Sequence, residues 1–129
     1  EKALAANPKD DHVLNNYSYF LSIRKEKLAL ADSLSARLVI DHPKNGTYQD
    51  TRAWVLYELK RYPEARVAME AALKDKENVS PTLWEHYGDV LFRLKLVDKA
   101  VEAWQEALRL DPTRESVDKK IRIRQIPEN

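Results

Sequence analysis

The chain has 129 residues, of which 43% are apolar and 33% are charged, and its formal net charge is +1. This length and composition indicate a single folded domain, and the balanced charge excludes a disordered tail and an obvious polyanion-binding protein. With two glycines and no cysteine, the sequence has no glycine-rich phosphate loop, disulfide framework, thiolate nucleophile or cysteine-based zinc site.

The first eight residues resemble the end of a helix that recurs further along the chain. Ala3, Leu4 and Pro8 stand at the same spacing as three residues of the run that closes at Pro112. Because proline cannot continue a helix in mid-run, we expect residues 1–8 to be the last turns of a helix from a preceding repeat. The chain is therefore expected to be a fragment of a longer array.

Residues 11–43 make up the first of three similar units. The apolar residues recur at helical intervals, which places them on one face of each of two consecutive helices. The two stripes consist of Leu14, Tyr17, Ser18 and Leu21, and of Leu28, Ala31, Leu34, Leu38 and Val39. We expect an antiparallel pair of helices, closed by Pro43.

Residues 46–79 repeat this pattern. The two stripes consist of Ala53 and Leu56, and of Tyr62, Ala65, Met69, Ala72 and Leu73. Pro63 suits the first turn of the second helix, where its missing N–H costs nothing. After the polar connector, Ser80 is a good N-cap residue and Pro81 a good first helical residue. A new helix is therefore expected to begin at this point.

Residues 81–112 carry the clearest copy. The stripes consist of Trp84, Tyr87, Gly88 and Leu91, and of Val97, Ala100, Val101, Trp104, Ala107 and Leu108. Gly88 and Ala100 fall where two closely crossing helices leave no room for bulk, and Trp84 and Trp104 are expected to fill the flanking space. Pro112 closes this unit.

Small residues recur at a fixed interval in the three units. Ser18, Ala53 and Gly88 are 35 residues apart at each step. Such a period indicates an array in which each hairpin buries its apolar stripe only against its neighbours. Residues 113–125 are predicted to form a capping helix whose polar outer face ends the stack, and residues 126–129 a tail.

The third unit resembles the tetratricopeptide repeat, a pair of antiparallel helices with a characteristic set of large and small residues in about 34 positions. The residues that carry the resemblance are Trp84, Tyr87, Gly88, Leu91, Ala100, Trp104, Ala107 and Pro112. It implies an all-α fold, an α-solenoid of helical hairpins with about seven helices including the capping helix. The run from Tyr48 to Tyr57 looks like a variant common in bacterial members of the family.

The resemblance also implies a non-catalytic protein–protein interaction module. In such arrays the first helices line a concave groove that binds peptides. The residues at the matching positions are Asn15, Asp50 and Glu85, then Tyr19, Trp54 and Asp89, then Ser22, Tyr57 and Phe92. Tyrosine and tryptophan are common at binding hot spots. We therefore expect a protein or peptide partner, and the acidic edge of the groove favours a basic or aromatic-seeking segment.

One subclass of these repeats grips the terminal carboxylate of chaperone tails through lysine and asparagine on the first helices. At the matching positions this sequence has Asn15, Tyr19 and Glu85. Because the required lysine is missing, a partner of the carboxylate-clamp type is not expected.

Two alternatives to the groove hypothesis stay open. The groove aromatics can instead pack against one another or against other intramolecular neighbours. The array can also be a structural spacer within a larger protein, or associate with another copy through its exposed N-terminal end. No arrangement of residues favours an enzyme.

The remaining polar signals favour surface roles. His86, with Asp89 three residues further on, is expected to be a surface histidine, because no metal-binding or nucleophile–base motif accompanies it. The basic runs at 24–27 and 119–124 are separated by acidic residues, so solvated faces are favoured over nucleic-acid binding. No run approaches the roughly 18 apolar residues of a membrane span. No cofactor is expected, and cytoplasm and bacterial periplasm or envelope both stay open.

Overall fold

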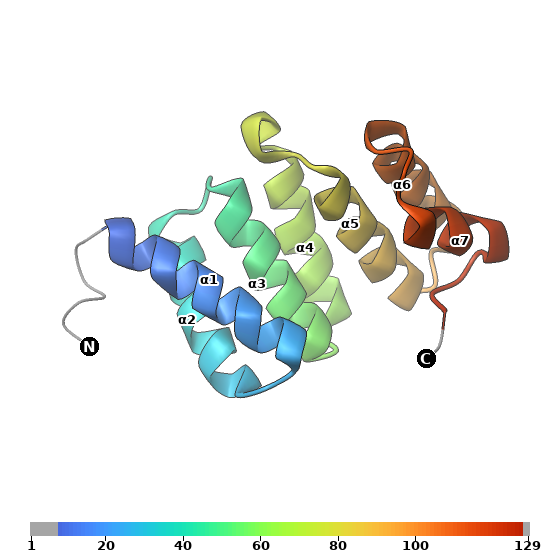
Figure 1. Ribbon diagram of the computed structural model, residues 1–129. Coiled ribbons are helices and arrows are strands. Elements are labelled where there is room, and N and C mark those ends of the chain that lie inside the picture. Colours follow the sequence, from blue (N-terminus) through green and yellow to red (C-terminus); the bar gives the residue numbers. More distant parts are fainter. Residues whose placement is uncertain (1–7, 128–129) are drawn as a thin grey trace.

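The computed structural model describes residues 8–127, and this part of the chain folds into seven α-helices without any strand (Figure 1). The helices are α1 (Pro8–Arg24), α2 (Leu28–Asp41), α3 (Gly46–Glu58), α4 (Tyr62–Leu73), α5 (Pro81–Arg93), α6 (Val97–Leu110) and α7 (Glu115–Ile123), with a 3-10 turn, η2 (Lys76–Asn78), between α4 and α5. The helical remnant predicted before Pro8 lies outside the described residues. The predicted all-α fold is confirmed.

The helices form three hairpins that stack in chain order. The pairs α1–α2, α3–α4 and α5–α6 pack against each other, α2 packs on α3 and α4 on α5, and α7 packs on α6. In Figure 1 the hairpins follow one another across the molecule, and the chain leaves at the end opposite α1. Successive first helices (α1 with α3, α3 with α5) are in closer contact than successive second helices. The first helices therefore line the inner face of the stack.

Local signals set the helix ends. The Asn45 side chain accepts a hydrogen bond from the Tyr48 backbone N–H at 3.1 Å and caps α3, and Ser80 does the same for α5 through the Leu83 N–H at 3.1 Å. Such caps satisfy backbone donors that have no partner within the helix. Pro81 begins α5 as expected. The sequence prediction of the cap at Ser80 is confirmed.

The small residues of the repeat occupy tight positions. Ser18 and Ala53 are fully buried on α1 and α3, and Gly88 is buried on α5. A Cβ atom on Gly88 would lie 2.3 Å from Cδ1 of Trp104. The indole of Trp104 on α6 therefore occupies the space that a side chain on α5 would need.

The first hairpin has the thinnest core. Most buried apolar residues of α3 to α7 fall into two clusters, one around Met69 and one around Trp104, whereas Leu21 of α1 and Ala31 of α2 join Val55 of α3 in a small third cluster. Tyr17, predicted on the packing stripe of α1, is 40% exposed, so this assignment is wrong. A tyrosine there has no helix to pack against among the described residues.

Candidate functional site

The inner face contains nine residues predicted to bind a partner, and the structure divides them into two groups. Three are buried: Asn15, Ser22 and Asp89. The other six are half-buried, namely Tyr19, Asp50, Trp54, Tyr57, Glu85 and Phe92. Ser22 donates its hydroxyl hydrogen to the Tyr19 carbonyl oxygen at 2.6 Å within α1. These three side chains are therefore largely covered by the stack itself, and the six half-buried ones stay candidates for contact with a partner.

The aromatic residues of the groove form a stack. The ring centroid of Trp54 lies 4.4 Å from that of Tyr57, with an interplanar angle of 5°, and 4.0 Å from that of His86, with an angle of 18°. Two nearly parallel rings at these distances occupy the two faces of the indole. Trp54 thus presents its edge to the groove. At this part of the site the aromatic side chains pack against one another, which is one of the two alternatives left open by the sequence.

His86 belongs to this stack and is buried, so the expectation of a surface histidine is wrong. Its Nδ1 atom lies 3.2 Å from Oδ1 of Asp50 on the preceding first helix. The histidine therefore joins α3 to α5 through both a ring contact and a polar contact. The partner expected from the sequence, Asp89, points into a different network.

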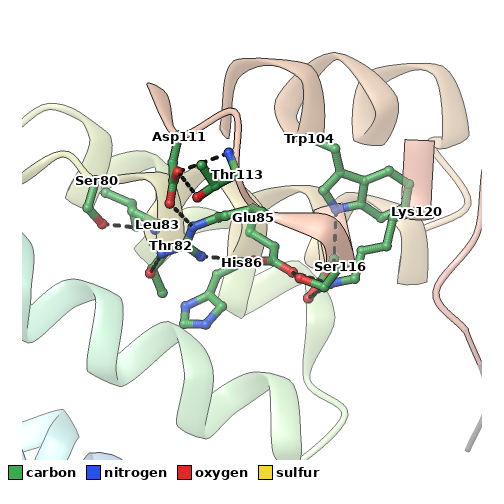
Figure 2. A network of polar contacts seen from close by, with 12 residues as sticks. Ser80, Thr82, Leu83, Glu85, His86, Trp104, Asp111, Thr113, Ser116 and Lys120 are labelled. Atoms are coloured by element: carbon green, nitrogen blue, oxygen red, sulfur yellow. Dashed lines mark hydrogen bonds and ion pairs between the residues drawn. The ribbon is translucent and has the colours of Figure 1, made fainter. Parts of the chain in front are cut away.

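A buried polar network joins α5 to α7 (Figure 2). The Lys120 ammonium donates to Glu85 at 2.7 Å and to the two carboxylate oxygens of Asp89 at 2.9 and 3.1 Å. Asp89 also accepts from Nε1 of Trp104 at 3.1 Å, and Arg114 donates to Glu85 at 3.1 Å. A buried charge is tolerated when partners compensate it in this way. The prediction that the basic run at 119–124 is a solvated face is wrong for Lys120.

Burial and pairing shift the pKa values of this network. Burial alone would raise the pKa of Glu85, but Lys120 and Arg114 outweigh burial and hold this pKa below its usual value. Burial would lower the pKa of Lys120, but Asp89 and Glu85 outweigh it and raise this pKa. Burial raises the pKa of Asp89, against the charges of Lys120 and His86. The network therefore depends on Lys120 remaining protonated.

An open cleft of about 470 Å³ lies beside the aromatic stack. Its lining residues are Lys25, Trp54, Tyr57, Glu58, Lys60, Tyr62, Asp89, Arg93, Ile126 and Pro127. The Arg93 guanidinium donates to the Tyr57 hydroxyl at 3.0 Å. Burial raises the pKa of Tyr57 to about 12, although Arg93 opposes the shift, so the hydroxyl stays protonated at neutral pH. The cleft combines aromatic edges with cationic side chains.

Sequence reasoning missed Arg93 and Lys120, although a spacing in the sequence could have found one of them. Equivalent positions of the repeat are 35 residues apart, but the polar contacts between first helices join residues 36 apart. The pairs at this spacing are Tyr48 with His12, His86 with Asp50, and Arg93 with Tyr57. Each hairpin is offset by about one position from the one before it. A search for polar residues 36 rather than 35 positions apart would have paired Tyr57 with Arg93.

Two further findings bear on function. Among residues 8–127, no group of three histidine or acidic side chains is arranged to hold a metal ion. Within the same part of the chain, no helix has the length and apolar character needed to cross a membrane.

A sequence comparison with protein families gives one match. A family model described as tetratricopeptide repeat matches residues 51–115, which is half of the chain. A comparison with curated protein sequences gives no match. The matched range contains the whole of α4, α5 and α6.

Several solved structures share the fold. The first TPR of Spaghetti (RPAP3), bound to an HSP90 peptide, superposes with a TM-score of 0.80 at 17% identity, covering 92% of this chain and 95% of that chain. The Arabidopsis OM64 TPR domain gives 0.79 at 20% identity, covering 92% and 97%. The second TPR domain of human RPAP3, in complex with an HSP70 peptide, gives 0.77 at 14% identity, covering 92% and 98%. At these low identities the similarity shows a shared fold and nothing further.

Proposed function

We propose that this chain, which belongs to the tetratricopeptide repeat family, is a non-catalytic interaction module that holds a segment of a partner protein along the inner face of α1, α3 and α5. The observation that carries the proposal is the cleft of about 470 Å³ beside Trp54 and Tyr57. A concave site lined by aromatic edges and a few charged groups is suited to a protein segment. The cleft is open, so an extended or helical segment can enter from the groove.

Solved structures with the same fold support this proposal. The first TPR of Spaghetti is bound to an HSP90 peptide, and the second TPR domain of human RPAP3 is in complex with an HSP70 peptide. We infer a comparable use of the inner face here, with a different partner. Asn15 is buried and Glu85 pairs with Arg114 and Lys120. These positions are therefore unsuited to gripping a terminal carboxylate.

The buried ionisable groups of the inner face support a structural rather than a catalytic role. Asp50 pairs with His86, and Lys120 pairs with both Glu85 and Asp89. The first contact ties α3 to α5, and the other two tie α5 to α7. A catalytic acid or base instead needs a position within reach of a substrate proton.

A capture experiment with two matched variants tests the groove. Tyr19→Ala with Phe92→Ala removes two half-buried aromatic side chains from the inner face, and Ile40→Ala with Val67→Ala removes two exposed apolar side chains from the second helices. Because truncation of a hot-spot residue costs about 2 kcal/mol or more, we expect specific partners to bind the wild type and the control, and to be depleted at least about tenfold with the groove variant. Quantitative mass spectrometry measures the difference.

The control variant makes the capture result decisive. Thermal melts of both variants establish that the stack is intact before capture. A partner set that the groove variant retains in full, or that both variants lose equally, would contradict binding in the groove.

A second candidate function, self-association, is favoured by the exposed side of α1 at the N-terminal end of the stack. Val13, Tyr17 and Phe20 form a stripe on α1 and are 63%, 40% and 52% exposed. Their counterparts 35 residues on, Tyr48, Arg52 and Val55, face the preceding hairpin, and Tyr48 and Val55 are buried. The α1 stripe thus corresponds to a surface that packs on a helix elsewhere in the stack, and such an apolar patch calls for a partner.

Light scattering across a concentration series tests self-association. Because Val13 and Phe20 are exposed, Val13→Lys with Phe20→Lys leaves the core intact. If the stripe joins two copies, the wild type forms dimers and the variant stays monomeric. A wild type that remains monomeric at high concentration would contradict this second candidate.

A further inference from the structure

The first helix of every hairpin ends in an unusual way. The residue that follows α1, α3 and α5 by one or two positions is a lysine with a left-handed backbone: Lys25 (φ 57°), Lys60 (φ 63°) and Lys95 (φ 67°). These lysines are 35 residues apart. At Lys60, the Lys60 N–H donates to the Tyr57 carbonyl at 2.9 Å and the following N–H, that of Arg61, donates to the Leu56 carbonyl at 2.9 Å. This pair of bonds is the Schellman motif, whose left-handed position glycine usually occupies.

Lysine is not the residue that backbone geometry favours there. A residue with a Cβ atom is strained in the left-handed region, and glycine is not. A positive charge does suit the C-terminal end of a helix dipole. The same charge one or two residues earlier, as at Arg24 and Arg93 in the last turns of α1 and α5, brings that benefit without the strain. A further reason is needed for lysine at all three turns.

The three lysines lie on the groove. Lys25 and Lys60 line the cleft of about 470 Å³ beside Tyr57, and Lys95 lines a neighbouring cleft of about 460 Å³ with Phe92. Arg93 lines both clefts and connects them. We call Lys25, Lys60, Arg93 and Lys95 the basic edge. It runs along the turns at the ends of α1, α3 and α5.

The charges of the basic edge are not neutralised within the described residues. None of its three lysines has an ion-pair partner there, whereas the acids of the inner face have partners of their own: Asp50 lies within hydrogen-bond distance of His86, and Glu85 and Asp89 form ion pairs with Lys120. The remaining acid of the clefts is Glu58, one carboxyl group against the four cationic side chains of the basic edge. The two clefts therefore carry more cationic than acidic side chains, in contrast to the acidic edge expected from the sequence.

We propose that the basic edge binds an acidic segment of a partner protein, whose carboxylates contact Lys25, Lys60 and Lys95 in turn. This rests on the proposed use of the groove and names the chemistry of the partner. Charge complementarity of this kind sets the choice of partner and the rate of encounter. It differs from the grip on a terminal carboxylate, because the contacts lie at the turns and recur with the repeat.

Nucleic acid is the other polyanion to consider. Single strands bind proteins by stacking bases on exposed aromatic faces beside a basic groove. Here Tyr57 and His86 cover the two faces of Trp54, and the Arg93 guanidinium lies 5.9 Å from the centroid of Tyr57. The faces of Trp54 are therefore not free to stack on bases, so an acidic protein segment fits the cleft better.

Fluorescence anisotropy with three labelled probes tests the proposal. The probes are an oligoglutamate peptide, a neutral glycine–serine peptide and a single-stranded oligouridylate. The variant is Lys25→Gly with Lys60→Gly and Lys95→Gly, in which glycine relieves the left-handed strain and so protects the fold. The matched control, Lys44→Gln with Lys74→Gln and Lys99→Gln, removes the same charge from exposed lysines that line neither cleft.

The proposal predicts that oligoglutamate binds the wild type and the control with similar Kd, and that binding weakens as salt increases. At about threefold per exposed ion pair, the glycine variant should bind about thirtyfold more weakly. Equal binding by the wild type and the glycine variant, or equal loss in the control, would overturn it. Tighter binding of the oligouridylate than of oligoglutamate would overturn it in favour of nucleic acid.

The two tests separate the two proposals. A wild type that binds no oligoglutamate, but whose captured partners depend on Tyr19 and Phe92, would overturn the basic edge and leave the groove standing. Oligoglutamate binding that depends on the three lysines, with captured partners indifferent to Tyr19 and Phe92, would overturn the groove as the partner site.

Discussion

Replacement of Gly88 by alanine tests the packing on which the repeat register depends. A Cβ atom at this position would lie 2.3 Å from Cδ1 and 2.4 Å from Nε1 of Trp104, whose indole is fully buried. Because the ring is enclosed and donates a hydrogen bond to Asp89 at 3.1 Å, it cannot move aside without losing that bond. Gly88→Ala therefore forces the two helices of the third hairpin apart or displaces the indole.

The magnitude follows from opposing effects. Alanine in place of glycine favours a helix interior by about 1 kcal/mol. Overpacking a tight core costs about 1–3 kcal/mol, and the lost hydrogen bond of Trp104 costs about 1 kcal/mol more. We expect Gly88→Ala to lower the free energy of unfolding by about 2 kcal/mol, against the gain that helix propensity alone predicts.

Guanidinium denaturation followed by circular dichroism measures this change. The double variant Gly88→Ala with Trp104→Leu should be less destabilised than the sum of the two single variants, because a smaller residue at 104 leaves room for the new methyl group. A Gly88→Ala variant as stable as the wild type, or additive effects in the double variant, would refute the assigned contact.

Other predictions concern stability. Ser18→Ala should raise the free energy of unfolding by about 1 kcal/mol in the same denaturation assay, because the buried Ser18 hydroxyl oxygen has no hydrogen-bond partner among the described residues; a loss of stability would contradict this. Lys120→Ala should lower the free energy of unfolding by about 3–5 kcal/mol, because it leaves Glu85 and Asp89 buried without their cation. A loss below about 1 kcal/mol, the value of an exposed ion pair, would show that these pairs are solvated. The pKa of Glu85 is held below its usual value of 4.5, so the ionised carboxylate stabilises the fold above that pH and this stabilisation is lost as the pH falls. Glu85→Gln should therefore make the free energy of unfolding less dependent on pH in the acid range. An unchanged pH dependence would count against the lowered pKa. Lys60→Gly should stabilise the chain by about 1 kcal/mol by relieving the left-handed turn; a lower melting temperature would argue against strain there.

The hairpins and their register were predictable because they depend on local periodicity. Apolar residues at helical spacing fix the helix faces, and the 35-residue recurrence of Ser18, Ala53 and Gly88 fixes the tight positions. The residues of the groove were only partly predictable for the same reason. A repeat position specifies where a residue lies on its helix, but not whether the next hairpin covers it.

The burial of the groove acids depends on contacts between hairpins. Asp89 is buried because α7 brings Lys120 across it, and no feature of the third repeat alone contains that information. His86 is buried because Trp54 and Asp50 of the preceding hairpin lie beside it. The lysines at the turns could have been identified from the sequence, because they recur every 35 residues. A search confined to apolar and small residues does not detect them.

Chemical-shift mapping tests most directly whether the inner face is the binding site. Backbone amide resonances of the labelled chain would be followed while a partner segment isolated by capture is added. The account predicts that the perturbed amides cluster on α1, α3 and α5 and at the turns of Lys25, Lys60 and Lys95. Perturbations confined to α2, α4 and α6 would place the partner on the opposite face and contradict the proposed function.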